Sequence, residues 1–147
     1  FDLDAFPEEY GLIQFKLGET FARMKESGEE RVSNVEKALF HYQACLQVYT
    51  SAARPLQFGL AAMSIGRLLG ERADLIIKYH PNRGQPKIKS NLENSVSNLE
   101  IAVDSLKDRT QAEARVELAQ AYLRKNKYHI GNEAMNQDSA RRTLEKA

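Results

Sequence analysis

The sequence predicts an all-α protein, built as an α-solenoid of three antiparallel helical hairpins. Apolar residues recur every three or four positions along nearly the whole chain, which is the spacing of one helix face. No run alternates apolar and polar residues as a half-buried strand does. The breaks between periodic stretches are short, so consecutive helices are expected to pack antiparallel. A chain of 147 residues has the size of one domain and can bury its own core.

Six helices are expected in chain order. The clearest apolar stripes lie within residues 13–24, 35–49, 58–76 and 92–106. Each stripe must be buried against a neighbouring helix, because its apolar side chains share one face. The sequence after residue 126 is more polar, and the last helix is placed there by its length and spacing. The expected helices span residues 7–27, 33–50, 55–79, 90–107, 110–126 and 132–146.

Boundary residues place the helix ends. Pro7 and Pro55 are expected in first turns, where the missing amide hydrogen would be unpaired anyway. Gly28, Asp108 and the segment 80–87 are interpreted as breaks. Three hydroxyl-and-carboxylate pairs have the spacing of a capping box, in which each side chain bonds a free amide of the first turn. These pairs are Ser33 with Glu36, Ser90 with Glu93, and Thr110 with Glu113.

Composition limits the classes of function. The formal net charge is +1, whereas a dedicated nucleic-acid binder usually has a strong basic excess. No stretch approaches the roughly 18 apolar residues of a membrane span, and no basic-then-apolar leader is visible at the start. The single cysteine, Cys45, excludes an internal disulfide and fits a reducing compartment. We therefore expect an intracellular, cytoplasmic protein without a membrane span.

The chain also repeats itself. The stretch 34–39, NVEKAL, aligns with 98–103, NLEIAV, and more faintly with 136–141, NQDSAR. A second phrase pairs a small residue with a large one three positions later. It occurs as Gly18 with Phe21, Gly66 with Leu69, and Ala119 with Tyr122. The small residue is expected to let two helices approach closely, while the large one fills the gap between hairpins.

These phrases resemble the tetratricopeptide repeat family. Its signature continues with an alanine and a large apolar residue four positions later. Here the matching pairs are Ala38 with Tyr42, Ala102 with Leu106, and Ala140 with Leu144. The units are about 50 residues long instead of about 34, so the resemblance is to extended arrays of large scaffold proteins. It implies one domain over 1–147, with repeats at about 7–50, 55–107 and 110–147.

The resemblance also implies a concave face lined by the first helix of each hairpin. Carried over residue by residue, that face would comprise Leu12, Phe15, Glu19, Arg23, Leu60, Met63, Arg67, Glu71, Val116, Gln120 and Arg124. The central row of Phe15, Met63 and Val116 either forms an apolar strip for a ligand or completes the core. The family's basic clamp for a terminal carboxylate is absent, because acids such as Glu19 stand at its positions. An apolar strip flanked by mixed charge suits an amphipathic helix or an extended peptide.

A basic connection after the third helix is the other candidate surface. Residues 78–89 are expected to form a long loop with the cations Lys78, Arg83, Lys87 and Lys89. These cations are either simply solvated or a docking site for an acidic partner or RNA. Tyr79 is the one aromatic residue among them, which argues against base stacking.

His41 and Cys45 lie one helical turn apart, a spacing that also suits two metal ligands. A structural zinc site needs four ligands, and the chain has one cysteine and three histidines. We therefore expect Cys45 to be a buried, unreactive packing residue and His41 to lie at the edge of a helix pair. No phosphate loop, zincin or nucleophile-elbow motif occurs.

The sequence thus predicts a non-enzymatic protein-interaction module without a cofactor or metal. It would bind a protein or peptide in its groove as an adaptor within a larger scaffold. A purely structural subunit and a binder of RNA or an acidic partner are the alternatives. The solenoid ends are expected to be incompletely capped and able to self-associate.

Overall fold

The computed structural model describes residues 3–81, 84–128 and 133–147. Six α-helices and no strand occur in these ranges, which confirms the predicted all-α class. The helices are α1 (Pro7–Arg23), α2 (Gly28–Cys45), α3 (Pro55–Tyr79), α4 (Gln85–Ser105), α5 (Asp108–Lys127) and α6 (Glu133–Glu145). In the described part of the chain, none of these helices combines the length and apolarity needed to cross a membrane.

The helix starts are partly as predicted. Pro7 and Pro55 begin α1 and α3, as their missing amide hydrogens favour. The turns at Gly28 and Asp108 are also confirmed, since both residues have a positive φ, of 67° and 52°. Glycine adopts this left-handed region freely and aspartate more readily than most residues. Both turns can therefore be short.

The three predicted capping boxes are wrong. Ser33, Ser90 and Thr110 lie inside α2, α4 and α5, whose N-caps are Ser27, Gly84 and Lys107. The acids of the boxes pair with basic side chains instead. Their partners are Arg72 for Glu36 at 2.7 Å, Lys89 for Glu93 at 4.0 Å, and Arg109 for Glu113 at 3.1 Å. The hydroxyl-to-carboxylate spacing of a capping box also occurs inside a helix, where it serves ordinary side-chain pairing.

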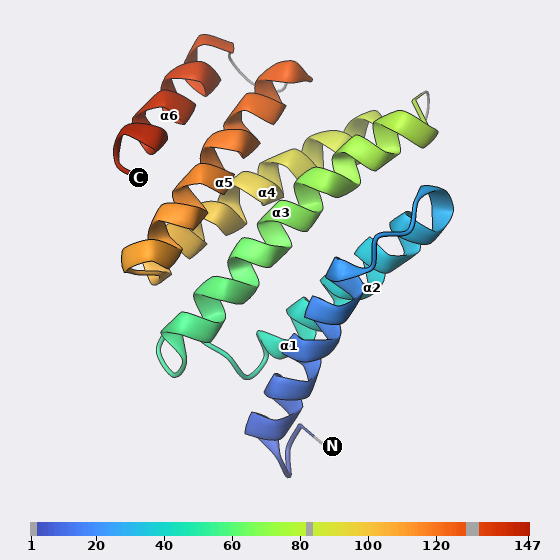
Figure 1. Ribbon diagram of the computed structural model, residues 1–147, viewed down its shortest axis with the longest axis vertical. Coiled ribbons are helices and arrows are strands. Elements are labelled where there is room, and N and C mark those ends of the chain that lie inside the picture. Colours follow the sequence, from blue (N-terminus) through green and yellow to red (C-terminus); the bar gives the residue numbers. More distant parts are fainter. Residues whose placement is uncertain (1–2, 82–83, 129–132) are drawn as a thin grey trace.

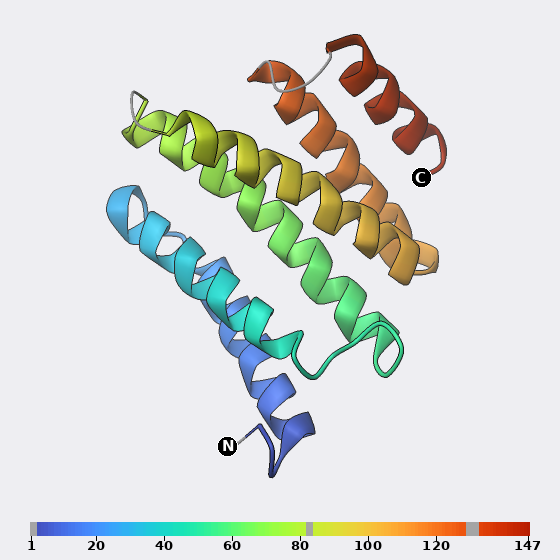
Figure 2. The same cartoon turned by 180° about the vertical axis from the view of Figure 1, so that it is seen from behind.

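Each helix packs against the next one in the chain. In Figure 1, α1, α3 and α5 lie nearer the viewer, while Figure 2 shows α2 and α4 in front on the opposite side. Paired helices run antiparallel, and α3 in addition contacts α2 and α5. The central helix α3 is therefore packed by both the preceding and the following pair.

The apolar core continues through these contacts. One cluster joins α2 to α3 and includes Val35, Tyr42 and Ile65, all at most 2% exposed. Further clusters join α3, α4 and α5, among them one around Leu99 and Leu118. The alanines predicted to pack, Ala38, Ala102 and Ala140, are all buried.

Glycines set the register of the first two helix pairs. A Cβ atom added to Gly18 would lie 3.0 Å from the ring of Tyr42, and one on Gly11 would lie 3.0 Å from Tyr49. In the second pair, a Cβ atom added to Gly66 would lie 2.6 Å from the side chain of Leu99. One added to Gly59 would lie 2.7 Å from that of Leu106. The close approach predicted at Gly18 and Gly66 is thus confirmed, because neither site has room for a side chain.

Two details of the repeat alignment differ from the prediction. Leu106, aligned in the sequence with Tyr42, contacts Gly59 and not Gly66. Phe21 was expected between hairpins but stacks on His41 within the first pair, with ring centroids 5.5 Å apart. The first difference accompanies the greater length of α3 and α4, and Phe21 in addition packs against the core cluster that joins α2 to α3.

Candidate functional site: a cationic cleft beside α3

A cleft opens between the α1–α2 turn and one face of α3. Its volume is about 840 Å³, within the range of about 300–1,000 Å³ typical of ligand pockets. One wall consists of residues 22–28 together with Arg31. The other wall is a row on α3 whose members, at steps of three or four, share one helix face. This row is Arg67, Glu71, Leu75 and Lys78, followed by Tyr79.

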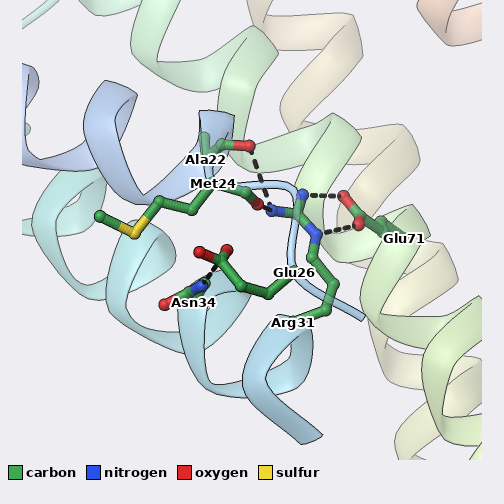
Figure 3. A network of polar contacts seen from close by, with 6 residues as sticks. All are labelled: Ala22, Met24, Glu26, Arg31, Asn34 and Glu71. Carbon is green, nitrogen blue, oxygen red and sulfur yellow. Dashed lines mark hydrogen bonds and ion pairs between the residues drawn. The ribbon is translucent and has the colours of Figure 1, made fainter. Parts of the chain in front are cut away.

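Arg31 fixes the geometry of the cleft (Figure 3). Its guanidinium donates two hydrogen bonds to Glu71, at 2.5 and 2.7 Å. It also donates to the carbonyl oxygens of Ala22, at 3.2 Å, and Met24, at 2.7 Å. Carbonyls at a helix C-terminus lack partners within their own helix, so Arg31 caps α1 while it holds α3. Hydrogen bonding to Glu71 raises the pKa of Arg31, which therefore stays charged.

The two acids of the cleft are already engaged. Glu71 accepts both bonds from Arg31, and Glu26 accepts a hydrogen bond from the Asn34 amide at 2.9 Å. Two cations, Lys25 and Arg67, line the same cleft without an acidic partner among the described residues. Two further cations complete the set: Arg23, which lies 3.6 Å from Glu19, and Lys78, which lies 5.2 Å from the centroid of the Tyr79 ring. The cations of the cleft lining outnumber its acids, so its net charge is positive.

The cleft also has an apolar part. Met24 and Tyr79 are 36% and 37% exposed, and Leu75 lines the cleft between them while packing against the α2–α3 core. Exposed apolar side chains beside uncommitted cations form a surface that can bind a ligand with both apolar and acidic groups.

Part of the predicted concave face lies in this cleft. Arg23, Arg67 and Glu71 line it together. The other predicted members do not: Leu12, Phe15, Glu19, Leu60, Met63, Val116, Gln120 and Arg124 lie outside its lining. Some of these have other partners, since Glu19 pairs with Lys16 at 2.8 Å and Arg124 with Asp74 at 3.1 Å.

The predicted apolar strip contacts the core. The Phe15 ring packs edge-on against Tyr42 with centroids 5.5 Å apart. Met63 packs against two core clusters, and Val116 is 40% exposed. Both Phe15 and Met63 are only partly buried. Their packing role is thus clear, and a ligand role for their exposed edges stays a prediction.

The long basic connection predicted at 78–89 is wrong. Helix α3 continues to Tyr79 and α4 begins at Gln85, with Pro86 in its first turn. Ile88 anchors the start of α4 in a cluster with Ala73 and Leu92, which shortens the connection. Of its predicted cations, Lys78 joins the cleft, Lys87 and Lys89 lie on α4, and Arg83 falls outside the described residues.

His41 and Cys45 lie in the first helix pair. Cys45 is 0% exposed, as predicted, and its Sγ donates to the Tyr42 carbonyl at 3.0 Å. Burial raises the pKa of this thiol to about 12. His41 is partly exposed at the edge of the pair, 2.7 Å from the Gln14 side-chain oxygen, and burial lowers its pKa.

Sequence reasoning missed Arg31, Leu75 and Tyr79. Arg31 was missed because the capping-box prediction began the second helix after it. Leu75 could have been found, since it continues the predicted row of Arg67 and Glu71 by one turn.

Comparisons of the chain with models of protein families, with curated proteins and with solved structures found no match. Family membership is therefore not shown, and the cleft is characterised by its own residues.

Proposed function

We propose that this chain is a non-enzymatic, tetratricopeptide-like solenoid of three hairpins that binds an acidic, partly apolar protein segment in the cleft beside α3. Two features support the solenoid: each helix packs on the next, and small residues mediate close contacts in successive pairs. As an intracellular adaptor domain, it would present this cleft within a larger scaffold.

The distribution of charge in the cleft carries the proposal. Glu71 is paired with Arg31, and Glu26 keeps its charge while it accepts a hydrogen bond from Asn34. Lys25, Arg67 and Lys78 are left without acidic partners among the described residues, so positive charge is in excess. An acidic ligand would supply these partners, and its apolar side chains would cover Met24, Leu75 and Tyr79. Apolar anchors give such an interface most of its affinity, while the charges orient the ligand.

The decisive experiment selects binders from a random peptide library with the wild-type protein and with the Arg67→Glu/Lys78→Glu variant. We expect wild-type binders rich in Asp, Glu and large apolar residues, and loss of these binders in the variant. The Lys107→Glu/Arg109→Glu variant changes the same charge at the far end of α4 and α5 and should bind normally. Selection of the same peptides by all three proteins would contradict the proposal.

Salt dependence and truncation refine the test. Binding of a selected peptide should weaken with salt without vanishing, because screening removes only the charge contribution. Phe15→Ala and Met63→Ala examine whether a ligand extends along the face beyond the cleft. An anchor lost there would cost about 1–3 kcal/mol of binding free energy, whereas a fall in melting temperature alone would assign both residues to the core.

Assembly through the outer helices is a second candidate function. Phe40 on α2 is 67% exposed, and Leu123 and Leu144 on α5 and α6 are each 47% exposed. Association of copies or of neighbouring domains would cover these side chains. Sedimentation velocity of the wild type and Phe40→Ser tests this function, which requires a concentration-dependent oligomer that the substitution weakens.

A further inference from the structure

A second groove lies on the opposite side of α3 from the cationic cleft. It runs between α2 and α4, the two helices that face the viewer in Figure 2. Its volume is about 360 Å³. The side chains of Leu46, Ile65 and Leu69 form an apolar floor, and the latter two are only 2% and 7% exposed.

Side-chain amides line one wall of this groove. Asn91, Asn94 and Asn98 follow one another on α4 at steps of three and four, so they share a face. At 1.5 Å per residue the row is about 10 Å long. Three residues of an extended peptide span about the same length, at roughly 3.3 Å each. Each amide offers one donor group and one acceptor, as a peptide bond does.

The side-chain nitrogen of Asn91 lacks a hydrogen-bond partner. The residue is 5% exposed, and its Nδ2 atom is buried without a hydrogen bond in the described protein. An unsatisfied buried donor lowers the stability of the fold, because it has given up its hydrogen bonds to water. Terminal amide torsions are broad, so the amide can turn about χ2 without breaking a bond made by Nδ2. A ligand carbonyl would then remove the cost.

The other two asparagines are anchored by their nitrogen atoms. Asn98 donates to the Asn94 carbonyl at 2.8 Å, and Asn94 donates to the Ser90 hydroxyl at 3.4 Å. Their side-chain oxygens have no partner among the described residues and can accept from ligand amides. The row therefore offers a donor at Asn91 and acceptors at Asn94 and Asn98, which could bind one C=O group and two N–H groups of a peptide.

The charge at the Asn91 end is positive. Arg72 pairs with Glu36 at 2.7 Å, and Lys87 has no acidic partner in the described part of the chain. An acidic side chain on the ligand would complete this end.

We propose that this groove binds a three-residue stretch of an extended peptide through the amides of Asn91, Asn94 and Asn98, with an acidic side chain beside Lys87. This site is separate from the cationic cleft and does not depend on it. The volume suits a single extended strand, since a helix with side chains is about 10–12 Å across.

The experiment uses the short probe N-acetyl-Ala-Val-Asp-amide at millimolar concentration and ¹⁵N-labelled protein. We expect the side-chain amide signals of Asn91, Asn94 and Asn98 to shift on titration. The neutral probe N-acetyl-Ala-Val-Asn-amide should bind more weakly to the wild type. Equal binding of N-acetyl-Ala-Val-Ala with a free carboxylate would show that a terminal carboxylate can replace the acidic side chain.

The variants separate binding from stability. Asn91→Leu should weaken the acidic probe at least about tenfold, yet keep or raise the melting temperature, because it removes an unsatisfied donor. Lys87→Ala should weaken binding of the acidic probe and leave binding of the neutral probe unchanged. Asn126→Leu, at the other buried amide with an unsatisfied atom, should bind normally. Absence of shifts, or shifts that persist in Asn91→Leu, would overturn the proposal, whereas failure in the cationic cleft would leave it intact.

Discussion

At both junctions with its neighbouring pairs, α3 contributes an acid that binds an arginine from elsewhere. The first junction also contains the reverse arrangement, Arg72 of α3 with Glu36 of α2. In the first junction, Arg31 of α2 donates two hydrogen bonds to Glu71 and two to carbonyls at the end of α1. In the second junction, Arg124 of α5 donates one to Asp74, at 3.1 Å. The side chains of Arg31 and Arg124 are 15% and 27% exposed.

The comparison indicates that an arginine contributes more to stability when its guanidinium bonds backbone carbonyls as well as the paired carboxylate. Arg31 also satisfies carbonyls that α1 leaves open, so its removal would orphan several acceptors at once. Arg124 shares Asp74 with Tyr128, whose hydroxyl donates to the same carboxylate at 2.7 Å. Loss of Arg124 would therefore leave Asp74 with one partner.

The largest predicted effect is the loss of the first junction. Arg31→Ala should lower the free energy of unfolding by about 2–3 kcal/mol, because it removes several charge-assisted hydrogen bonds. Arg124→Ala should cost only about 1 kcal/mol, as is usual for partly exposed pairs. Urea unfolding followed by circular dichroism measures both. Arg109→Ala, whose side chain is 92% exposed, is the control. Equal losses of unfolding free energy in Arg31→Ala and Arg124→Ala would refute the ranking.

Cys45 can report whether the first junction opens locally. In the wild type a bulky thiol reagent should react slowly, because the thiol is fully buried and its pKa is raised to about 12. Arg31→Ala should accelerate labelling at least about tenfold, the factor that 1.4 kcal/mol produces. Labelling that follows only each variant's global stability would show that the first pair does not open on its own.

Alkaline pH should weaken the second junction, as it should other sites at which burial raises the pKa of a tyrosine, such as Tyr42 and Tyr122. Burial and the hydrogen bond to Asp74 raise the pKa of Tyr128 to about 12, whereas an unfolded tyrosine titrates near 10. The folded protein thus holds this proton more tightly, so its contribution is complete below pH 10 and is lost as pH rises from about 10 to 12. Tyr128→Phe should remove the share of that loss due to Tyr128 in urea unfolding across this range. Tyr122→Phe, which removes the hydroxyl that donates to Glu100, should remove a separate share.

Gly70 gives the smallest expected change. A Cβ at this position would lie 2.5 Å from Nη1 of Arg124, so alanine would displace that side chain. The cost should be offset by about 0.5–1 kcal/mol of helix propensity, leaving Gly70→Ala nearly neutral. In the Arg124→Ala background the same substitution should be stabilising. A double-mutant cycle measures this coupling, and additivity of the two changes would contradict it.

Periodicity predicted the all-α class and the order of the helices, because a continuous apolar stripe depends on sequence spacing alone. The breaks at Gly28 and Asp108 were predictable for a different reason, because few residue types favour a positive φ. The starts of α2 and α4 were misplaced. Their position is decided by tertiary contacts, such as Ile88 packing into the core, that outweigh a local capping motif.

The cleft was predictable only in part. The row of Arg67 and Glu71 follows from helical spacing, but the role of Glu71 does not. Arg31 lies 40 positions earlier in the chain, and only the packing of α2 on α3 brings the two together. Lys25 and Lys78 likewise lack acidic partners among the described residues because the acids of the cleft bind other side chains, which the sequence alone does not show.

The glycine contacts bear on which insertions and deletions the helix pairs can tolerate. In each of the first two pairs, a step of seven residues along the first helix is matched by a step of seven backwards along the second helix and the turn that follows it. Gly11 and Gly18 meet Tyr49 and Tyr42, and Gly59 and Gly66 meet Leu106 and Leu99. Sliding one helix by seven residues would again set a glycine opposite a large side chain. In the second pair, a slide of four residues would set Gly70 opposite Leu99 but Met63 opposite Leu106, so only one of the two contacts would again meet a small residue. In-frame insertions or deletions of seven codons are therefore the changes these pairs can best absorb.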